Sequence, residues 1–330
     1  MKKSTVIRKL LLGISTSFPL FAYAQTKDTI PAVKQQSYPL EKPLILQYDR
    51  INNAEYTTRD RDGQILKEGK AQISRFRAYG SFKIYQKEKV TLSTSLLYTH
   101  ENITNYTRNV TENSLAKNSF NTNDVDLIVN GFYRSTLWNR PLIHSASVII
   151  ASPNVFDVKK VFAMVSSSVV FVKGPQTRYT LGLALALDPS TIIPVLPLVT
   201  YWHRFDNPFW EIDIVLPQKI ALRRANFLKG WFTVGTELCG NGFFATESTN
   251  RQGNYEYRYT DLYSGVGYER LVGKLLIGAR TGFRSTIQGR MLKVYNRNND
   301  YLFDTKNNTV PYLNLSISLA IPQLFTRNVK

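Results

Sequence analysis

Cysteine is nearly absent from this chain of 330 residues, which contains Cys239 alone. An intrachain disulfide is therefore excluded, as is a metal site built on several thiolates. Histidine is also scarce: the three residues are His100, His144 and His203, and neither His-x-His nor His-Glu-x-x-His spacing occurs. We therefore predict no metal site and no cofactor.

Long apolar runs are missing too. No stretch of about 18 apolar residues follows residue 24, so a transmembrane helix is not expected there. A closed β-barrel can still cross a membrane, because its strands alternate apolar and polar residues instead of running apolar throughout.

Residues 1–24 have the pattern of a secretory signal peptide. Four cations precede an apolar stretch from Leu10 to Phe21, and Ala22-Tyr23-Ala24 is a small-x-small cleavage site. An uncleaved helical anchor is the rival interpretation, but the apolar stretch is short for an anchor and contains Pro19. Residues 25–42 are polar and predict a periplasmic leader, and 43–330 show no break in composition and predict one domain.

Acidic residues are outnumbered, with 24 Asp and Glu against 42 Lys and Arg, and the formal net charge is +18. Loss of the four signal-peptide cations leaves +14. Such a charge can indicate nucleic-acid binding, but export and the scatter of the cations argue against that partner. Outer-membrane lipids and the phosphates of lipopolysaccharide suit the compartment better, as does a cation-rich pore wall that passes a small solute.

Alternation with a period of two is the strongest pattern in the chain. From Tyr312 to Ile321, every second residue is Leu or Ile and those between are polar or small. This period is typical of a β-strand with one apolar face. Similar segments occur at 74–85, 89–100, 176–187, 208–216, 230–240 and 274–288.

The spacing of these segments favours a barrel over a soluble sandwich, which also alternates. Short connections alternate with longer ones, and the longest are expected at 50–68, 101–123, 241–256 and 289–310. Outer-membrane barrels have short periplasmic turns and long extracellular loops. The predicted fold is therefore an all-β, antiparallel transmembrane β-barrel in the bacterial outer membrane.

The strand count depends on two segments. Pro217 suits a turn better than a central strand, which separates 208–216 from 218–225. With Pro43–Tyr48 as the first strand, the count is fourteen. If 208–225 is one bent strand and Pro43–Tyr48 lies outside the barrel, the count is twelve. We favour fourteen.

Tryptophan and the charged residues make separate predictions. The four tryptophans lie near predicted periplasmic turns and predict an aromatic belt at the membrane interface: Trp138, Trp202, Trp210 and Trp231. A cation facing lipid at the midplane costs about 2–4 kcal/mol, so the charged faces are predicted to point into the lumen. The predicted lumen-facing residues are Arg75, Arg77, Arg178, Glu211, Asp213, Arg223, Glu237, Asp261, Glu269, Arg280 and Arg284.

The lumen charges leave two outcomes open. If they neutralise one another and close the bore, the barrel is a rigid plug, whereas excess cations around water would favour anions. Our leading hypothesis is a passive pore or transport-related barrel for small, anionic solutes. The alternative is a structural or surface-binding barrel that acts through 101–123, 241–256 and 289–310. Oligomeric state and solute are not fixed by the sequence.

An outer-membrane lipid-modifying enzyme is the third hypothesis and the least favoured. His144 neighbours Ser145, but adjacent strand residues point to opposite faces, and a nucleophile needs a base in hydrogen-bonding reach. No Gly-x-Ser-x-Gly elbow occurs. We therefore predict that the protein is not an enzyme and assign no catalytic residue. A serine hydroxyl beside His144 or His203 at the rim would favour the enzyme.

The segment from Pro194 to Phe244 resembles an uncharacterised family of bacterial outer-membrane β-barrels. The resemblance rests on Pro197–Tyr201, Trp210–Pro217 and Thr236–Phe243, and it continues through Tyr259–Tyr268. It implies a barrel in the outer membrane. It implies no substrate and no catalytic residue.

Overall fold

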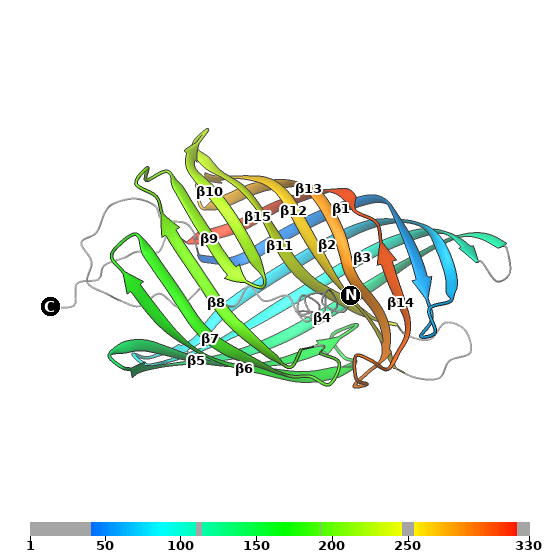
Figure 1. Ribbon diagram of the computed structural model, residues 1–330, viewed down its shortest axis with the longest axis horizontal. Coiled ribbons are helices and arrows are strands. Elements are labelled where there is room, and N and C mark those ends of the chain that lie inside the picture. The colour runs from blue at the N-terminus through cyan, green and yellow to red at the C-terminus, as the bar shows by residue number, and fades with distance from the viewer. Residues whose placement is uncertain (1–40, 110–113, 192, 246–253, 322–330) are drawn as a thin grey trace, which may run out of the picture.

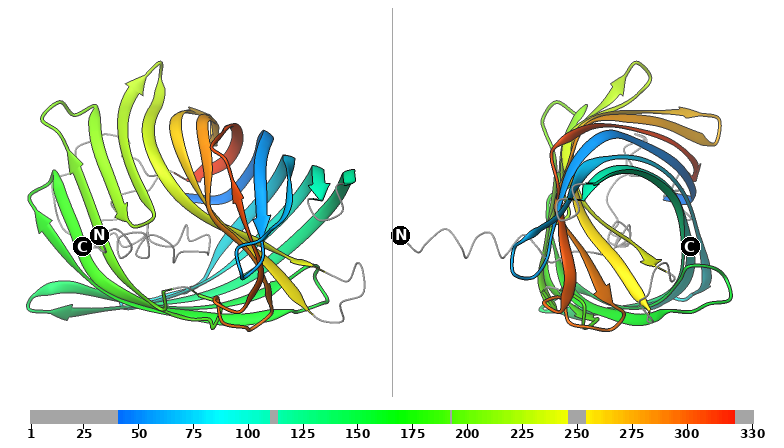
Figure 2. Two further views of the ribbon diagram at one scale, coloured as in Figure 1. Left: turned by 45° about the vertical axis from the view of Figure 1, so that its right-hand side comes forward. Right: turned by 90° about the vertical axis from the view of Figure 1, so that its right-hand side faces the viewer.

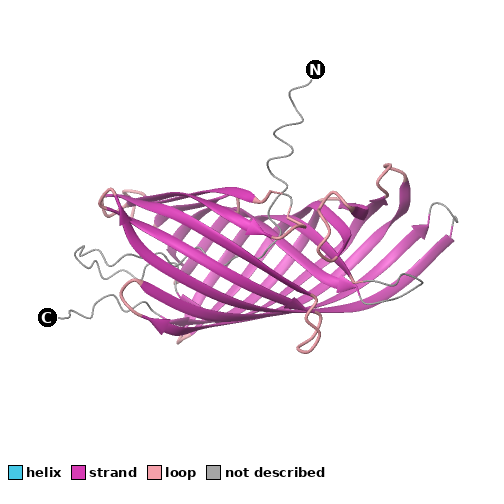
Figure 3. Cartoon of the chain, turned by 90° about the horizontal axis from the view of Figure 1, so that it is seen from below, coloured by secondary structure: helices cyan, strands magenta, loops and turns pink. Residues whose placement is uncertain are grey.

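The computed structural model describes residues 41–109, 114–191, 193–245 and 254–321, and its regular structure in these ranges is entirely β (Figure 3). The signal peptide predicted at 1–24 and residues 25–40 of the predicted leader lie outside the described residues. No helix within the described ranges is long and apolar enough to cross a membrane. The strands are β1 (Glu41–Arg59), β2 (Ile65–Gln86), β3 (Val90–Asn109), β4 (Ser114–Leu137), β5 (Arg140–Ser152), β6 (Lys160–Lys173), β7 (Thr177–Leu187), β8 (Val195–Arg204), β9 (Trp210–Leu216), β10 (Lys219–Phe227), β11 (Gly230–Ala245), β12 (Tyr255–Val272), β13 (Leu275–Lys293), β14 (Tyr301–Asn307) and β15 (Val310–Ile321).

The strands form one closed antiparallel ring (Figure 1, Figure 2). Neighbours in the chain pair with one another, and β1 completes the ring by pairing with β15. The short β14 lies between β13 and β1 and runs in the same direction as β15, so the two form one interrupted strand. The ring therefore has fourteen strands, which confirms the favoured count. Pro217 lies in the turn between β9 and β10, as predicted.

The two ends of the ring differ. Turns of two to five residues join β2 to β3, β4 to β5, β6 to β7, β8 to β9, β10 to β11 and β12 to β13. All of these turns lie at the end that also holds the start of β1 and the end of β15, and we call it the lower end. Connections at the upper end are more varied, with two residues between β9 and β10 and seven between β5 and β6. An end that carries short turns throughout is typical of the periplasmic side of an outer-membrane barrel, so the upper end is extracellular.

Alternating residues divide between an outer and an inner face. Leu181, Leu183, Leu315 and Ile317 point outward and are 46–58 % exposed in the isolated chain. Polar residues between them, such as Asn314 and Ser318, are buried inside. A closed barrel leaves no unpaired edge in lipid, and its apolar outer face matches the hydrocarbon layer. The chain is therefore a transmembrane barrel of the outer membrane.

The predicted long loops are largely strand, and this part of the sequence analysis was wrong. Within 101–123, β3 and β4 remain paired up to Asn109 and Ser114, and within 289–310 the chain forms the end of β13 and all of β14. The prediction 50–68 covers the upper parts of β1 and β2, and 241–256 includes the end of β11 and the start of β12. Above the lipid the outer face of a strand contacts water, so strands rich in Asn and Thr show no apolar alternation.

The wall of the barrel is uneven in height. Strands β1 to β4 contain 19–24 residues, whereas β7 to β10 contain 7–11. Figure 1 shows the short strands on one side and the long strands on the other. β10 begins at Lys219, opposite Glu237, so β11 continues upward to Ala245 without this partner.

The upper parts of β11 and β12 lie inside the lumen, and we call residues 238–245 and 255–261 the inner hairpin. Glu256 and Tyr259 point to opposite faces of β12, yet both are buried. The ring of Phe243 lies 6.2 Å from that of Phe120 on β4, although β11 and β4 are not neighbours in the ring. The face with Phe243 and Tyr259 therefore packs on β1 to β3 and on the upper part of β4. The face with Glu256 and Arg258 lies toward β4 to β6.

A tight approach of two backbones shapes the wall below the inner hairpin. Gly265 on β12 lies opposite Gly282 on β13, and a Cβ added to Gly265 would lie 2.1 Å from the carbonyl oxygen of Thr281. We predict that Gly265→Ala lowers the free energy of unfolding by about 1–3 kcal/mol, because the backbone must move to admit the methyl group. Urea unfolding in detergent, followed by tryptophan fluorescence, measures this.

Gly80→Ala is the matched control, since the nearest atom to its added Cβ is 3.6 Å away on the ring of Phe82. Its free energy of unfolding should stay within about 0.5 kcal/mol of the parent. Equal effects of the two substitutions would show that the Gly265–Gly282 approach is not tight.

Candidate functional site

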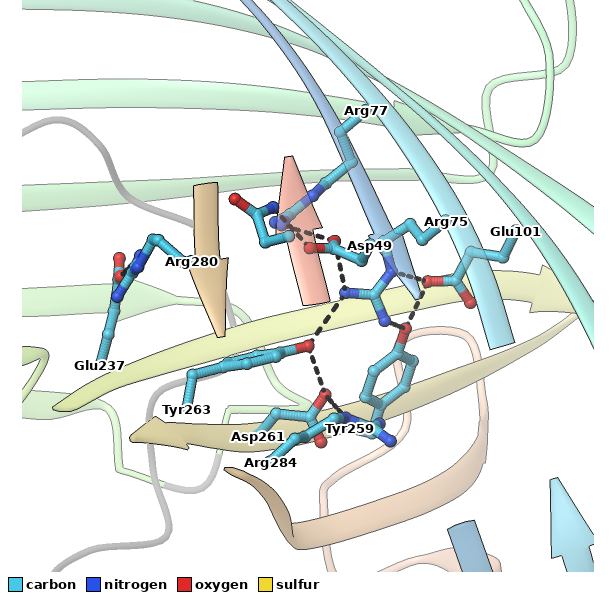
Figure 4. A network of polar contacts seen from close by, with 11 residues as sticks. Asp49, Arg75, Arg77, Glu101, Glu237, Tyr259, Asp261, Tyr263, Arg280 and Arg284 are labelled. Carbon is cyan, nitrogen blue, oxygen red and sulfur yellow. Dashed lines mark hydrogen bonds and ion pairs between the residues drawn. The ribbon is translucent and has the colours of Figure 1, made fainter. Parts of the chain in front are cut away.

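A network of charged and tyrosine side chains fills the lumen at the lower part of the inner hairpin (Figure 4). Arg75 lies at its centre and is fully buried. Its Nε donates a hydrogen bond of 2.5 Å to Glu101, and its guanidinium lies 3.8 Å from Asp49. We call this network the Arg75 cluster; it comprises Asp49, Arg75, Arg77, Glu101, Tyr259, Asp261, Tyr263, Arg284 and Asn314.

Strand register brings the first members together. Arg75 on β2 lies directly opposite Asp49 on β1 and Glu101 on β3. Asn314 on β15 lies opposite Asp49 and donates to it at 2.6 Å. Directly opposed residues share a face, so this register places all four side chains on the inner surface.

The other members reach Arg75 from across the lumen. The hydroxyl of Tyr259 accepts a hydrogen bond of 2.6 Å from Arg75 and donates one of 2.5 Å to Glu101. Tyr263 accepts from Arg75 at 3.3 Å and donates to Asp261, which also pairs with Arg284 at 2.7 Å. Because β2 and β12 are not neighbours in the ring, these bonds span the interior.

Apolar side chains seal the same region. They are buried around the Arg75 cluster and come from both sides of the lumen: Ile51, Ile73, Ile103, Phe243, Val310 and Tyr312. Desolvating a charge costs several kcal/mol unless it is paired and hydrogen-bonded, so the geometry of the cluster cannot loosen without loss of stability. The arrangement closes this part of the lumen with a fixed network.

A second network fastens the inner hairpin to the opposite wall, and the sequence analysis did not find it. Lys160 on β6 pairs with Glu256 at 2.8 Å and with Asp188 at 3.0 Å. Arg258 pairs with the same two carboxylates, at 2.9 Å and 2.8 Å. With Ser190, which accepts a hydrogen bond from Lys160 and donates one to Asp188, these residues form the Lys160 cluster.

The remaining predicted lumen residues also lie on inner faces. Arg223 pairs with Glu211, Asp213 pairs with Lys219 at 2.5 Å, and Arg280 pairs with Glu237 at 2.8 Å. Glu269 pairs with Lys42 at the lower end, at 2.7 Å. The Nε of Arg178 is buried and has no hydrogen-bond partner among the described residues.

The four tryptophans all lie at the lower end, but they do not share one face. Trp138 is 81 % exposed, and Trp210 lies on the outer face of β9. Trp231 is buried against Leu276 and Ala320 inside the barrel. Trp202 shares the inner face of β8 with Leu198. The predicted aromatic belt is therefore wrong for Trp231 and Trp202, because register and not ring chemistry decides the face.

Several site residues escaped the sequence analysis because their partners are distant in the chain. Asp49 follows the predicted strand Pro43–Tyr48, and extending its period by one residue would have found it. Asp124 and Asp126 continue the inner face of β4, with Ile128 as the next inward residue. Lys160 and Glu256 carry no local signal, since the turn of the inner hairpin into the lumen creates their contact.

The histidines lie near the lower end or on the upper wall. The Nε2 of His144 lies 3.3 Å from the hydroxyl oxygen of Ser135 on the outer face. Tyr133 stacks on the imidazole at 6.0 Å, and no carboxylate is bonded to His144 among the described residues. His203 contacts Thr177 and His100 contacts Asn123. The Ser135–His144 pair therefore lacks the third group that orients a base.

Asp188 belongs to the connection between β7 and β8, outside the spanning strands. Burial raises the pKa of Asp188, but the charges of Arg258 and Lys160 lower it by more than burial raises it. The pKa is therefore about 2, against an ordinary 3.8. A lowered pKa in the folded state stabilises the fold above the unfolded pKa, and that stabilisation is lost as the pH falls through the folded pKa. The Lys160 cluster should therefore persist in mild acid.

We predict that Asp188→Asn lowers the free energy of unfolding by about 2 kcal/mol at neutral pH. The difference from the parent should stay constant down to about pH 5 and shrink between about pH 4 and pH 2, where Asp188 takes up its proton in both states. Urea unfolding at a series of pH values measures it. Asp300→Asn, in an exposed pair with Arg61, is the control and should differ little from the parent. A difference that disappears already at pH 6 would contradict the assignment.

Comparison with known proteins finds no matching family model and no matching curated protein. The resemblance to an uncharacterised family therefore remains a prediction. Among solved structures, the chain is similar to an outer-membrane channel from Pseudomonas putida F1, with 12 % identity, 88 % of this chain and 100 % of that chain covered, and a TM-score of 0.36. It is also similar to the transport unit of the autotransporter AIDA-I from Escherichia coli (12 % identity, 85 % and 91 % covered, TM-score 0.34) and to a Pseudomonas aeruginosa FadL homologue (8 % identity, 84 % and 89 % covered, TM-score 0.31). Similarities this weak assign neither a family nor a function.

Proposed function

We propose that this protein is a transport-related outer-membrane barrel for small solutes whose axial path is closed in the state described. The observation that supports the proposal is the full burial of Arg75, which bonds to β3 and, across the lumen, to β12. A cylinder of fourteen strands is wide enough for an interior path, and here side chains from opposite walls occupy it.

The charge pattern supports a solute other than a simple anion. Excess cations around water would favour anions, but Arg75, Arg77, Arg223, Arg280 and Arg284 each pair with a carboxylate. Neutralised charges attract no counter-ion into the path. We therefore propose transport of small solutes without a preference for anions.

A structural or surface-binding role is the second candidate, and one feature favours it. An open hollow of about 720 Å³ lies at the upper ends of β1 to β4, on strands that extend beyond the lipid. Its lining mixes aromatic and charged residues: Tyr56, Tyr106, Lys70, Arg108 and Lys117 among them. The Ser135–His144 pair is too incomplete to support an enzyme, and we propose none.

Planar-bilayer conductance tests the transport role. We predict low conductance for the refolded parent and a severalfold increase for the double variant Arg75→Ser, Glu101→Ser. The two substitutions remove both charges of the pair together, so neither partner is left buried and uncompensated, and the small side chains admit water.

The control is Arg61→Ser with Asp300→Ser, which removes an exposed ion pair of 2.9 Å far from the lumen. It should conduct like the parent. Heat-dependent migration on gels confirms that each variant is folded. A parent that already conducts as a wide, steady pore would contradict the closed state, and a folded lumen variant that conducts no more than the control would contradict the transport role.

A further inference from the structure

The hairpin of β9 and β10 is the lowest part of the wall. β9 contains 7 residues, whereas a tilted strand needs about 9–11 to cross the hydrocarbon layer. At about 3.3 Å per residue and a tilt of about 45°, β9 rises roughly 16 Å, against an apolar band of about 25 Å. The turn at Pro217 therefore lies at the depth of lipid chains.

The strands on either side continue above this turn. β8 pairs with β9 only from Val199 downward, so its upper part, 195–198, extends past Leu216. On the other side, β11 turns inward above Glu237 as part of the inner hairpin. No strand in the described ranges stands between the upper part of β8 and β11 at this height.

Proline marks the upper part of β8 as an edge. The amide of Ala186 on β7 donates to the carbonyl oxygen of Pro194 at 2.8 Å. Because backbone amides alternate in direction along a strand, the nitrogens of Val195 and Pro197 point away from β7, toward the side where β9 is missing. Pro197 has no N–H, so it removes a donor that would otherwise lie unsatisfied in lipid.

The inner wall beside this edge is apolar, although a barrel lumen is usually polar. Leu196 and Leu198 lie opposite Ala184 and Gly182, point inward, and pack against a buried cluster of Ile128, Ile149 and Met164. On the outer face, Leu183, Leu185, Val195 and Leu216 are 41–58 % exposed. Apolar surface therefore runs from the lipid-facing belt over the edge and onto the inner wall.

From this continuity we infer that the gap above the β9–β10 turn is a lateral entrance for an acyl chain. The lipid around the barrel supplies such chains at this depth, and the apolar side chains of the inner wall beside the edge, Leu196 and Leu198 among them, receive one. The inference rests on the proposed transport function and deepens it, because it assigns the solute to amphipathic molecules that carry an acyl chain. These molecules reach the lumen from the bilayer and not along the closed axial path.

Fluorescence quenching by lipids with brominated chains tests the entrance. Cys239→Ser removes the sole cysteine, and Leu198→Cys then carries a bimane label on the inner wall. Leu183→Cys labels the outer face as the lipid reference, and Ser145→Cys labels the inner face of β5, away from the edge. In brominated phosphatidylcholine vesicles, we expect the label at 198 to be quenched at least half as strongly as that at 183, and the label at 145 to be quenched little.

Quenching at 198 no stronger than at 145 would overturn the inference. If Leu198→Cys does not fold, as shown by heat-dependent migration, Leu196→Cys takes its place on the same inner face. The measurement is independent of the conductance test. Quenching at 198 without any conductance would support the entrance and contradict the transport role. A conducting lumen variant without quenching at 198 would support the transport role and contradict the entrance.

Discussion

Pairing of buried charges is the constraint on which the rest of this structure depends. An unpaired guanidinium or carboxylate inside the barrel would cost several kcal/mol, so each inward charge must find an opposite charge or a hydroxyl. Strand register supplies the nearest partners, as with Asp49, Arg75 and Glu101. The phenols of Tyr259 and Tyr263 then accept hydrogen bonds from Arg75 across the lumen and so join β12 to β2.

The uneven height of the wall determines where this network forms. Because β9 and β10 are short, the upper part of β11 has lost its neighbour on one side, and the inner hairpin can turn into the lumen. There its two faces have different chemistry: Tyr259 and Phe243 pack on β1 to β4, and Glu256 and Arg258 pair with Lys160 and Asp188. The same shortening closes the axial path and leaves the gap beside β8, so the two proposals have one structural origin.

The sequence was informative wherever a property belongs to one strand. Period-two alternation predicted the faces of segments such as Tyr312–Ile321, and Pro217 located the turn that settles the count of fourteen. Strand length was not predictable in the same way, because the polar upper parts of β3 and β4 lack the alternation that lipid imposes lower down. The Lys160 cluster could not be predicted from the sequence, because Lys160 and Glu256 are 96 residues apart and meet only where the inner hairpin turns into the lumen.

The position of the inner hairpin is the central claim, and a cross-link tests it most directly. With Cys239 replaced by serine, Phe120→Cys on β4 and Phe243→Cys on β11 replace two rings whose centroids are 6.2 Å apart. A short bifunctional maleimide should join these cysteines efficiently in lipid vesicles, and it should fail to join Phe120→Cys to Leu198→Cys. If Phe120→Cys and Phe243→Cys remain unlinked in folded protein, the strands form an open cylinder and the closed lumen is contradicted.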